Sequence, residues 1–365
     1  MSVRPPRIVP FIFLSFLFVA SAFSQSAPKV APLPYDPLEL ATGPTLVPDT
    51  PEKRALLLNL LERARQNSAM HTPGMAPFAL KVSFNSIGGD SHNQGYGEVE
   101  ETWLNGQTWR WSARLGDYSQ LRIFYEGAAY DDKPHGHIPL RIQMVRNSVF
   151  WPMVGNFAPS LIRMATAKWE GTEIACVLAS RGGNDPSATP GRRWEENEFC
   201  IDPKSGLLHI HSEAPGIYSV YDYNGAIEFH GRILPRETTI VEGGTTVLQI
   251  HLEDIQDANR DPNQFIPTKK MISHGPGAIM VGPFRFPEVV RAPAGYSGVI
   301  QPVVVHAILD GKGKVLDAEV VQTSDPALAA AALGVVWHSS YRPAEQPNRP
   351  LQREAFINVQ FTPTS

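Results

Sequence analysis

This chain of 365 residues has little cysteine and little net charge. It has two cysteines, Cys176 and Cys200, so at most one disulfide can form within it. Its 32 lysine and arginine residues almost balance 36 acidic residues, which leaves a formal net charge of -4. That balance gives no electrostatic case for nucleic-acid binding.

The short motifs of common enzyme classes are missing as well. The sequence has no GxSxG nucleophile elbow, no P-loop and no dinucleotide fingerprint. Glu98, Glu100 and Glu101 are candidates for acid-base work, but the strand period of two puts Glu98 and Glu100 together on one solvated face. We therefore predict a protein that is not an enzyme, with no catalytic residues and no cofactor.

Two histidine pairs have a spacing that can put both rings on one face, His135 with His137 and His209 with His211. Neither pair has a nearby cysteine or a further histidine at ligand spacing. Histidines on the surface or on a strand face explain this pattern better than a metal, so we predict no metal site.

The length exceeds one ordinary core and predicts two domains after a leader. Arg4 and Arg7 precede an apolar run at 8–20 that ends in small residues, which is typical of a secretory signal peptide, assigned to 1–24. The run is short for a span of about 20 residues, so cleavage is favoured over the alternative of a retained anchor. The proline-rich residues 25–50 predict an extended linker, and the protein should be periplasmic.

Residues 51–268 predict one helix followed by a long antiparallel sheet. Thr50 and Pro51 match an N-cap and a first helical position, and leucines then recur at helical spacing. From 78 to 266, short alternating runs are separated by turn residues. A less regular middle portion is expected to contain a second helix near 159–167.

Two stretches of this region carry a resemblance to a known family, GYGEVEETWLNGQTWRWSARLGDYSQLRIFYEG and FHGRILPRETTIVEGGTTVLQIHLEDI. A helix that feeds a long meander resembles the LolA-like periplasmic lipoprotein carriers, over about residues 52–268. The resemblance implies an open, half-barrel-like sheet that holds acyl chains against its concave side, with helices as a lid. It implies a cavity and not a particular cargo.

Tryptophans gather on two neighbouring predicted strands. Trp109 and Trp111 share one strand face, and Trp103 lies on the preceding strand. Together with Leu60 on the apolar side of the helix, they are our candidate ligand-binding residues. The alternative is an ordinary dry core beneath the helix, and the sequence does not separate a cavity from a core.

The last part of the chain predicts a smaller unit with the order β-β-α-β. Two alternating runs flank the turn at 310–313, and a final alternating run covers 355–361. Between them, Asp325 and Pro326 match the start of a helix that continues as an alanine-rich run.

The segments DGKGKV, SDPALAAAAL, YRPA and FINVQF resemble the TonB C-terminal domain family. We assign this resemblance to a domain at 284–365, after a linker at 269–283. Ser339 and Asn348 stand where the family more often has tryptophan and glycine. The predicted fold is therefore α+β, with a large antiparallel half-barrel-like sheet, an N-terminal helix and a small TonB-like domain.

The favoured function is that of a non-enzymatic cell-envelope binding protein. It would carry a lipid or acyl group in the β domain and dock a protein partner through the C-terminal domain. One alternative is a TonB-type energy transducer for outer-membrane transport. Another is an envelope scaffold whose last strand, at 356–361, lies at a sheet edge and accepts a strand from its partner.

Cys176 and Cys200 lie in successive predicted strands of an exported chain, which predicts a disulfide between them. Closing a loop of about 25 residues should contribute roughly 3 kcal/mol by restricting the unfolded chain. Two unpaired buried thiols are the alternative.

Overall fold

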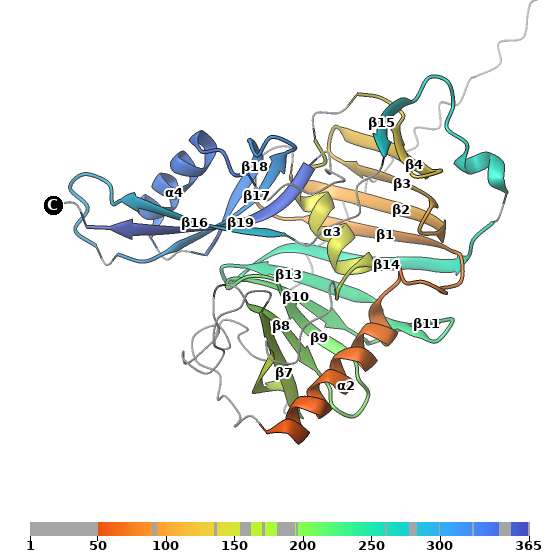
Figure 1. Ribbon diagram of the computed structural model, residues 1–365, viewed down its shortest axis with the longest axis horizontal. Coiled ribbons are helices and arrows are strands. Elements are labelled where there is room, and N and C mark those ends of the chain that lie inside the picture. The colour runs from red at the N-terminus through yellow and green to blue at the C-terminus, as the bar shows by residue number, and fades with distance from the viewer. Residues whose placement is uncertain are drawn as a thin grey trace, which may run out of the picture. The chain divides into compact units, whose positions relative to one another are not determined.

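Antiparallel sheet makes up most of the chain that the structure describes (Figure 1). The structure is a computed structural model that describes residues 50–89, 93–134, 137–153, 162–169, 172–180, 194, 196–259, 261–276, 283–298, 300–322, 325–342 and 352–363. All of them fall within one compact unit, Pro34–Ser365. The predicted signal peptide, and the predicted linker before Thr50, lie outside the described residues.

Two meanders join edge to edge in one large sheet of 13 strands, in the order β15-β5-β4-β3-β2-β1-β14-β13-β10-β9-β8-β7-β6. The first meander has β1 (Phe78–Ser86), β2 (Gly95–Asn105), β3 (Thr108–Leu115), β4 (Tyr118–Tyr125) and β5 (Ala128–Asp131). The second has β6 (Ile162–Trp169), β7 (Thr172–Ser180), β8 (Glu196–Ile201), β9 (Leu208–Ser212), β10 (Ile217–Asp222), β13 (Glu237–Glu242) and β14 (Thr245–Asp257). A hairpin of β11 (Ile227–Phe229) and β12 (Arg232–Leu234), the 3-10 turn η2 (Pro262–Phe265) and edge strand β15 (Ile272–Pro276) complete this part. The described strands leave β15 and β6 as edges, so the sheet is open.

The pairing of β1 with β14 joins the two meanders. Val82 lies opposite Val99 of β2 on one side and Leu252 of β14 on the other. Alternate residues of β1, such as Phe78 and Leu80, are buried on the inner face of the sheet. The predicted alternation is therefore confirmed, because one face of these strands forms the core and the other meets water.

Helix α2 (Pro51–Ser68) begins as predicted, with the Thr50 side chain accepting a hydrogen bond from the Lys53 amide. Its buried leucines pack against the second meander. The second helix is α3 (Leu140–Phe150), and the helix predicted near 159–167 is wrong because 162–167 belong to β6. Nearly all of α3 is buried, polar residues included, so its sequence carries no one-sided apolar pattern.

A second, four-stranded sheet follows with the order β16-β19-β17-β18. Its elements are β16 (Phe284–Arg291), β17 (Val303–Asp310), β18 (Val315–Gln322), α4 (Pro326–His338) and β19 (Gln352–Thr362). The predicted β-β-α-β order is confirmed in β17, β18, α4 and β19. The edge position predicted for 356–361 is wrong, because β19 lies between β17 and a parallel β16.

The two sheets share one hydrophobic cluster. Val304, Ile308 and Phe356 of the C-terminal sheet belong to the same buried cluster as the inner face of β1 and β2. β15 lies within the predicted linker at 269–283 and pairs with β5 at the edge of the large sheet. The described part of that segment is thus built into the fold.

Candidate ligand-binding site

A small cavity lies between the ends of α2 and α3 and the inner face of the large sheet. Its volume is about 30 Å³, and its wall is mainly apolar. Val82 contributes from β1, Leu252 from β14, and Val149 and Pro152 from the end of α3. Ser68 closes it at the last turn of α2, so both helices contribute to one pocket against the sheet.

Two tyrosines in the cavity wall have their hydroxyl groups bonded to backbone carbonyls. Tyr221 donates to the Ser148 carbonyl at 3.3 Å, and Tyr223 donates to the Leu208 carbonyl at 3.0 Å. Burial raises the pKa of both hydroxyls well above the usual value, so both stay neutral. With their polar ends occupied, the rings present apolar surface to the cavity.

The four predicted ligand-binding residues lie elsewhere. Leu60 packs beneath α2 with Phe199 of the second meander. Trp103 and Trp111 are buried in the core shared by the two sheets, and half-buried Trp109 stacks on the Phe124 ring at 5.1 Å. The structure brings the tryptophans together but separates them from Leu60, and none of the four lines the cavity. Their role in binding stays a prediction.

An ion-pair group surrounds Trp111. The Arg146 guanidinium lies 4.4 Å from the centre of the Trp111 ring and donates to Glu101 at 3.3 Å. Glu101 also pairs with His71. Burial would raise the pKa of Glu101, but His71 and Arg146 outweigh it and hold that pKa below its usual value.

The sequence marked Glu101 as a candidate beside Glu98 and Glu100 but did not predict its buried position. Glu98 and Glu100 do share the outer face as predicted, where both contact Lys81. Glu101 alternates with them and faces inward with Trp103. The alternation of the strand puts Glu101 on the same face as the core residues, and this pattern could have identified it as buried. A buried carboxylate requires a cationic partner.

One side of α3 contacts the C-terminal sheet through charged groups. Arg141 donates to Glu242 of β13 at 3.2 Å and also to Glu319 of β18. His306 of β17 contacts Glu354 at 2.7 Å and Glu242 at 3.5 Å. Helix α3 therefore faces an apolar cavity at its C-terminal end and a polar cluster along its side.

Burial and charge shift the pKa values in this cluster. Burial would lower the pKa of His306, but its bonds to Glu242 and Glu354 raise the pKa to about 10. Burial, the largest cause, raises the pKa of Glu319 to about 7 although Arg141 opposes the change. His306 is thus a cation at neutral pH, held between two carboxylates.

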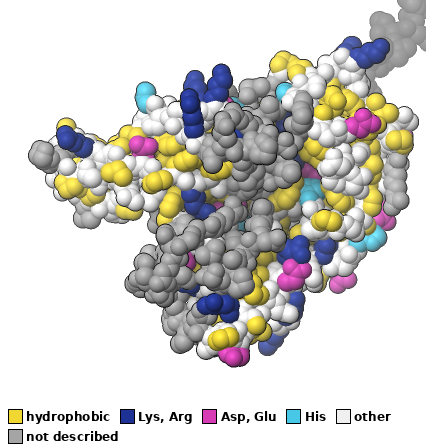
Figure 2. All heavy atoms as spheres, in the orientation of Figure 1, with side chains coloured by type: hydrophobic (Ala, Val, Ile, Leu, Met, Phe, Trp, Pro, Cys, Tyr) yellow, Lys and Arg dark blue, Asp and Glu magenta, His cyan; other side chains and the backbone are white. Residues whose placement is uncertain are grey.

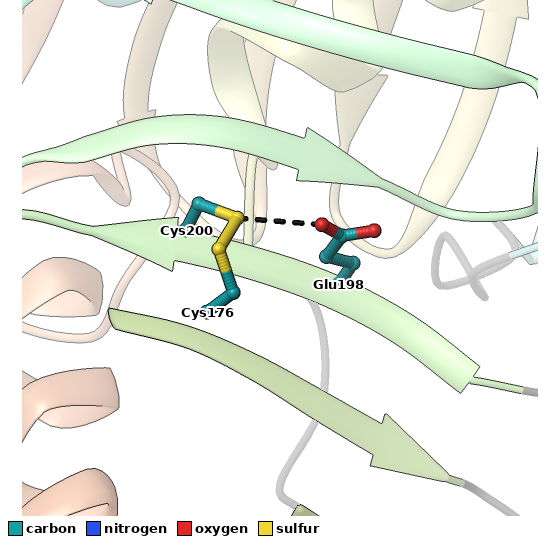
Figure 3. The surroundings of a disulfide bond; sticks show 3 residues. All are labelled: Cys176, Glu198 and Cys200. Carbon is teal, nitrogen blue, oxygen red and sulfur yellow. Dashed lines mark hydrogen bonds between the residues drawn. A yellow bond between two sulfur atoms is a disulfide. The ribbon is translucent and has the colours of Figure 1, made fainter. Parts of the chain in front are cut away.

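The predicted disulfide is confirmed. Cys176 and Cys200 lie directly opposite one another on β7 and β8 and are bonded (Figure 3). A Glu198 carboxylate oxygen lies 3.4 Å from the Cys200 sulfur. A disulfide sulfur has no proton to donate and is not a thiolate ligand, so these three residues cannot hold a metal while the bond is intact.

The predicted histidine pairs occupy ordinary packing positions where they are described. His211 stacks on the Phe199 ring at 4.8 Å, and His209 lies edge-on to Tyr223 at 5.6 Å. His137 lies 3.9 Å from Asp317, whereas His135 is outside the described residues.

Acidic and basic side chains are interspersed among the described residues on the face shown in Figure 2. Among the described helices, none is both long enough and apolar enough to span a membrane.

Comparisons with known proteins give weak structural matches. One is a LolA superfamily protein from Nitrosomonas europaea, at 11% identity and a TM-score of 0.37, covering 57% of this chain and 96% of that one. Another is a DUF1329 family protein from Desulfovibrio piger, at 8% identity and a TM-score of 0.36, covering 60% and 98%. No family model and no curated protein matches the sequence.

Proposed function

We propose that this protein is a non-enzymatic periplasmic binding protein that holds an apolar chain, such as a lipid or acyl group, between its helices and the large sheet. The observation that carries this proposal is the apolar cavity beneath the ends of α2 and α3. Among its described lining residues there is no carboxylate, histidine or cysteine, so the site offers binding surface without an acid-base pair.

The cavity must enlarge to take a chain. Its volume of about 30 Å³ is far below the several hundred Å³ of a typical ligand pocket. Separation of the helix ends from the sheet would expose the same apolar wall, and it would break the polar bonds that hold the helix ends in place. The bond from Tyr221 to the Ser148 carbonyl is one of them. An entering chain would replace apolar contacts that the helices give up.

Docking of a protein partner by the C-terminal sheet is a second part of the proposal. The TonB-type transducer and the envelope scaffold stay as alternatives, without the strand-addition site at β19, because that strand has neighbours on both sides. Edge strands β16 and β18 and the half-exposed Trp337 of α4 are the described surfaces left to such a partner.

Native mass spectrometry of the exported protein, followed by lipid extraction, tests the carrier function. We expect co-purifying acyl species, and displacement of the neutral fluorophore N-phenyl-1-naphthylamine by added fatty acids. Val149→Trp fills the cavity and should weaken fluorophore binding by about tenfold or more, because one buried aromatic excludes several methylene groups.

Val289→Trp is the matched control, since Val289 is 62% exposed on β16, remote from the cavity. It should leave binding unchanged. A protein that is free of lipid and binds neither fluorophore nor fatty acid would contradict the carrier function.

A further inference from the structure

A second cavity continues the first along the same strands. It also has a volume of about 30 Å³ and lies between α3 and the strands β9, β10 and β13. Ser219 and Ile240 form its floor, and they are paired across β10 and β13. Tyr221 and Thr238 form the next inward-facing pair of the same strands, and both line the first cavity. The two floors are therefore about 7 Å apart, two residues along one face.

The described linings of the two cavities have one residue in common. Ser148 of α3 lines both of them, and its carbonyl accepts the hydrogen bond from Tyr221 at 3.3 Å. Movement of α3 away from the sheet, which the proposed function requires, would break this bond. The two cavities would then form one channel beneath the helix.

The two ends of this channel differ in chemistry. Both cavities have mainly apolar walls, but the wall of the second also includes His211, Glu213 and Glu354 together with Asn147 of α3. Its described lining includes two carboxylates and no lysine or arginine. A long ligand would therefore meet apolar surface at one end and hydrogen-bond acceptors at the other.

Two cations near the second cavity, His306 and Arg141, have carboxylate partners. His306 lies behind Glu354 and is shared with Glu242, and Arg141 is shared by Glu242 and Glu319. Arg285 donates to the Glu213 carbonyl. Glu354 accepts one bond at each oxygen, from His306 and from Asn147, and a carboxylate has about four acceptor positions. Glu354 can thus accept from a ligand as well.

We infer that the ligand is an amphipathic molecule with one alkyl or acyl chain and a positively charged ammonium head. The chain occupies the first cavity, and the head donates hydrogen bonds to Glu354 and Glu213 in the second. An ammonium group has three donors and no acceptor, which matches the two carboxylates in the wall of this cavity. This inference rests on the proposed function and adds the class of head group.

Decylamine and decanoate, which share chain length and differ in charge, provide the test with the full-length exported protein. Each probe is titrated against bound N-phenyl-1-naphthylamine at pH 7, below the micellar concentration of the probe. We expect decylamine to bind about tenfold more tightly or better, because a partly buried opposite charge is only weakly screened. Glu213→Gln should reduce that preference by at least about threefold, whereas Glu228→Gln, which removes an exposed charge on β11, should leave it unchanged.

Equal binding of the two probes, or tighter binding of decanoate, would overturn the ammonium head and leave the carrier function standing. A preference for decylamine that persists in both Glu213→Gln and Glu354→Gln would place the head elsewhere and overturn the assignment of the second cavity. Failure of both probes and of the fluorophore to bind would instead remove the proposed function, and this inference with it.

Discussion

At the scale of single residues, buried charges in this protein are held by specific partners from distant parts of the chain. Glu101 of β2 meets Arg146 of α3, and His306 of β17 meets Glu242 of β13. Each group would be costly to bury alone, so the positions of these elements depend on one another.

Arg146→Ala should lower the free energy of unfolding by about 3–5 kcal/mol, because it leaves the buried Glu101 without its guanidinium partner. Urea denaturation of the variant measures this loss. Addition of Glu101→Gln should recover part of it, since the double variant no longer buries a carboxylate that keeps only His71 as its partner. If Glu101→Gln lowers the free energy of unfolding as much in the Arg146→Ala variant as in the wild type, the two residues are not coupled.

His306 should make the protein less stable at alkaline pH. Its pKa is raised from 6.5 to about 10 in the folded protein, so its stabilising contribution is complete below about 6.5 and is lost as the pH rises through about 10. We expect the free energy of unfolding to fall between pH 7 and 10, and His306→Gln to flatten that fall. The exposed His338→Gln serves as the control, and a wild-type slope in His306→Gln would contradict the assignment.

At the scale of elements, α3 is the helix whose start depends most on tertiary structure. Pro139 occupies its N-cap position and provides no side-chain cap. The cap comes from Asp317 of β18, which accepts hydrogen bonds from the Leu140 amide at 3.0 Å and from the Asn93 side chain at 3.1 Å. The C-terminal sheet therefore completes the helix that closes the candidate site.

Asp317→Ala should destabilise the protein by about 1–2 kcal/mol and increase amide hydrogen exchange in the first turn of α3. Asp325→Ala provides the matched comparison, because Asp325 caps α4 through the Ala327 and Leu328 amides. That variant should lose a similar amount of stability and leave exchange in α3 unchanged. Unchanged exchange in α3 of Asp317→Ala would show that the cap does not hold the helix.

At the scale of the whole molecule, the two described sheets share one buried cluster, so we expect them to unfold together. Phe356 of β19 has no exposed surface and belongs to the same core cluster as Val82 of β1. Charged contacts from α3 cross the same boundary. Either sheet alone would expose part of this core.

Phe356→Ala should therefore destabilise both sheets together, by about 3–5 kcal/mol, because it leaves a cavity in the shared core. Differential scanning calorimetry should give one transition for the wild type and one, at lower temperature, for the variant. Phe286→Ala, at a partly buried position of β16, should cost less. Two separate transitions in the wild type, with only one shifted in the variant, would contradict a shared core.

The sequence by itself determined the local parts of this protein, since alternation, turns, caps and cysteine placement depend on near neighbours. It predicted α2, most strands of the large sheet, the β-β-α-β order and the disulfide. Tertiary structure decided the rest. Polar residues of α3 are buried because segments far away in the chain supply their partners. β19 is an interior strand because β16 pairs with its second edge. The candidate site followed the same rule, because its cavity joins two helices to strands far apart in the chain, whereas the predicted tryptophans pack in the core beside it.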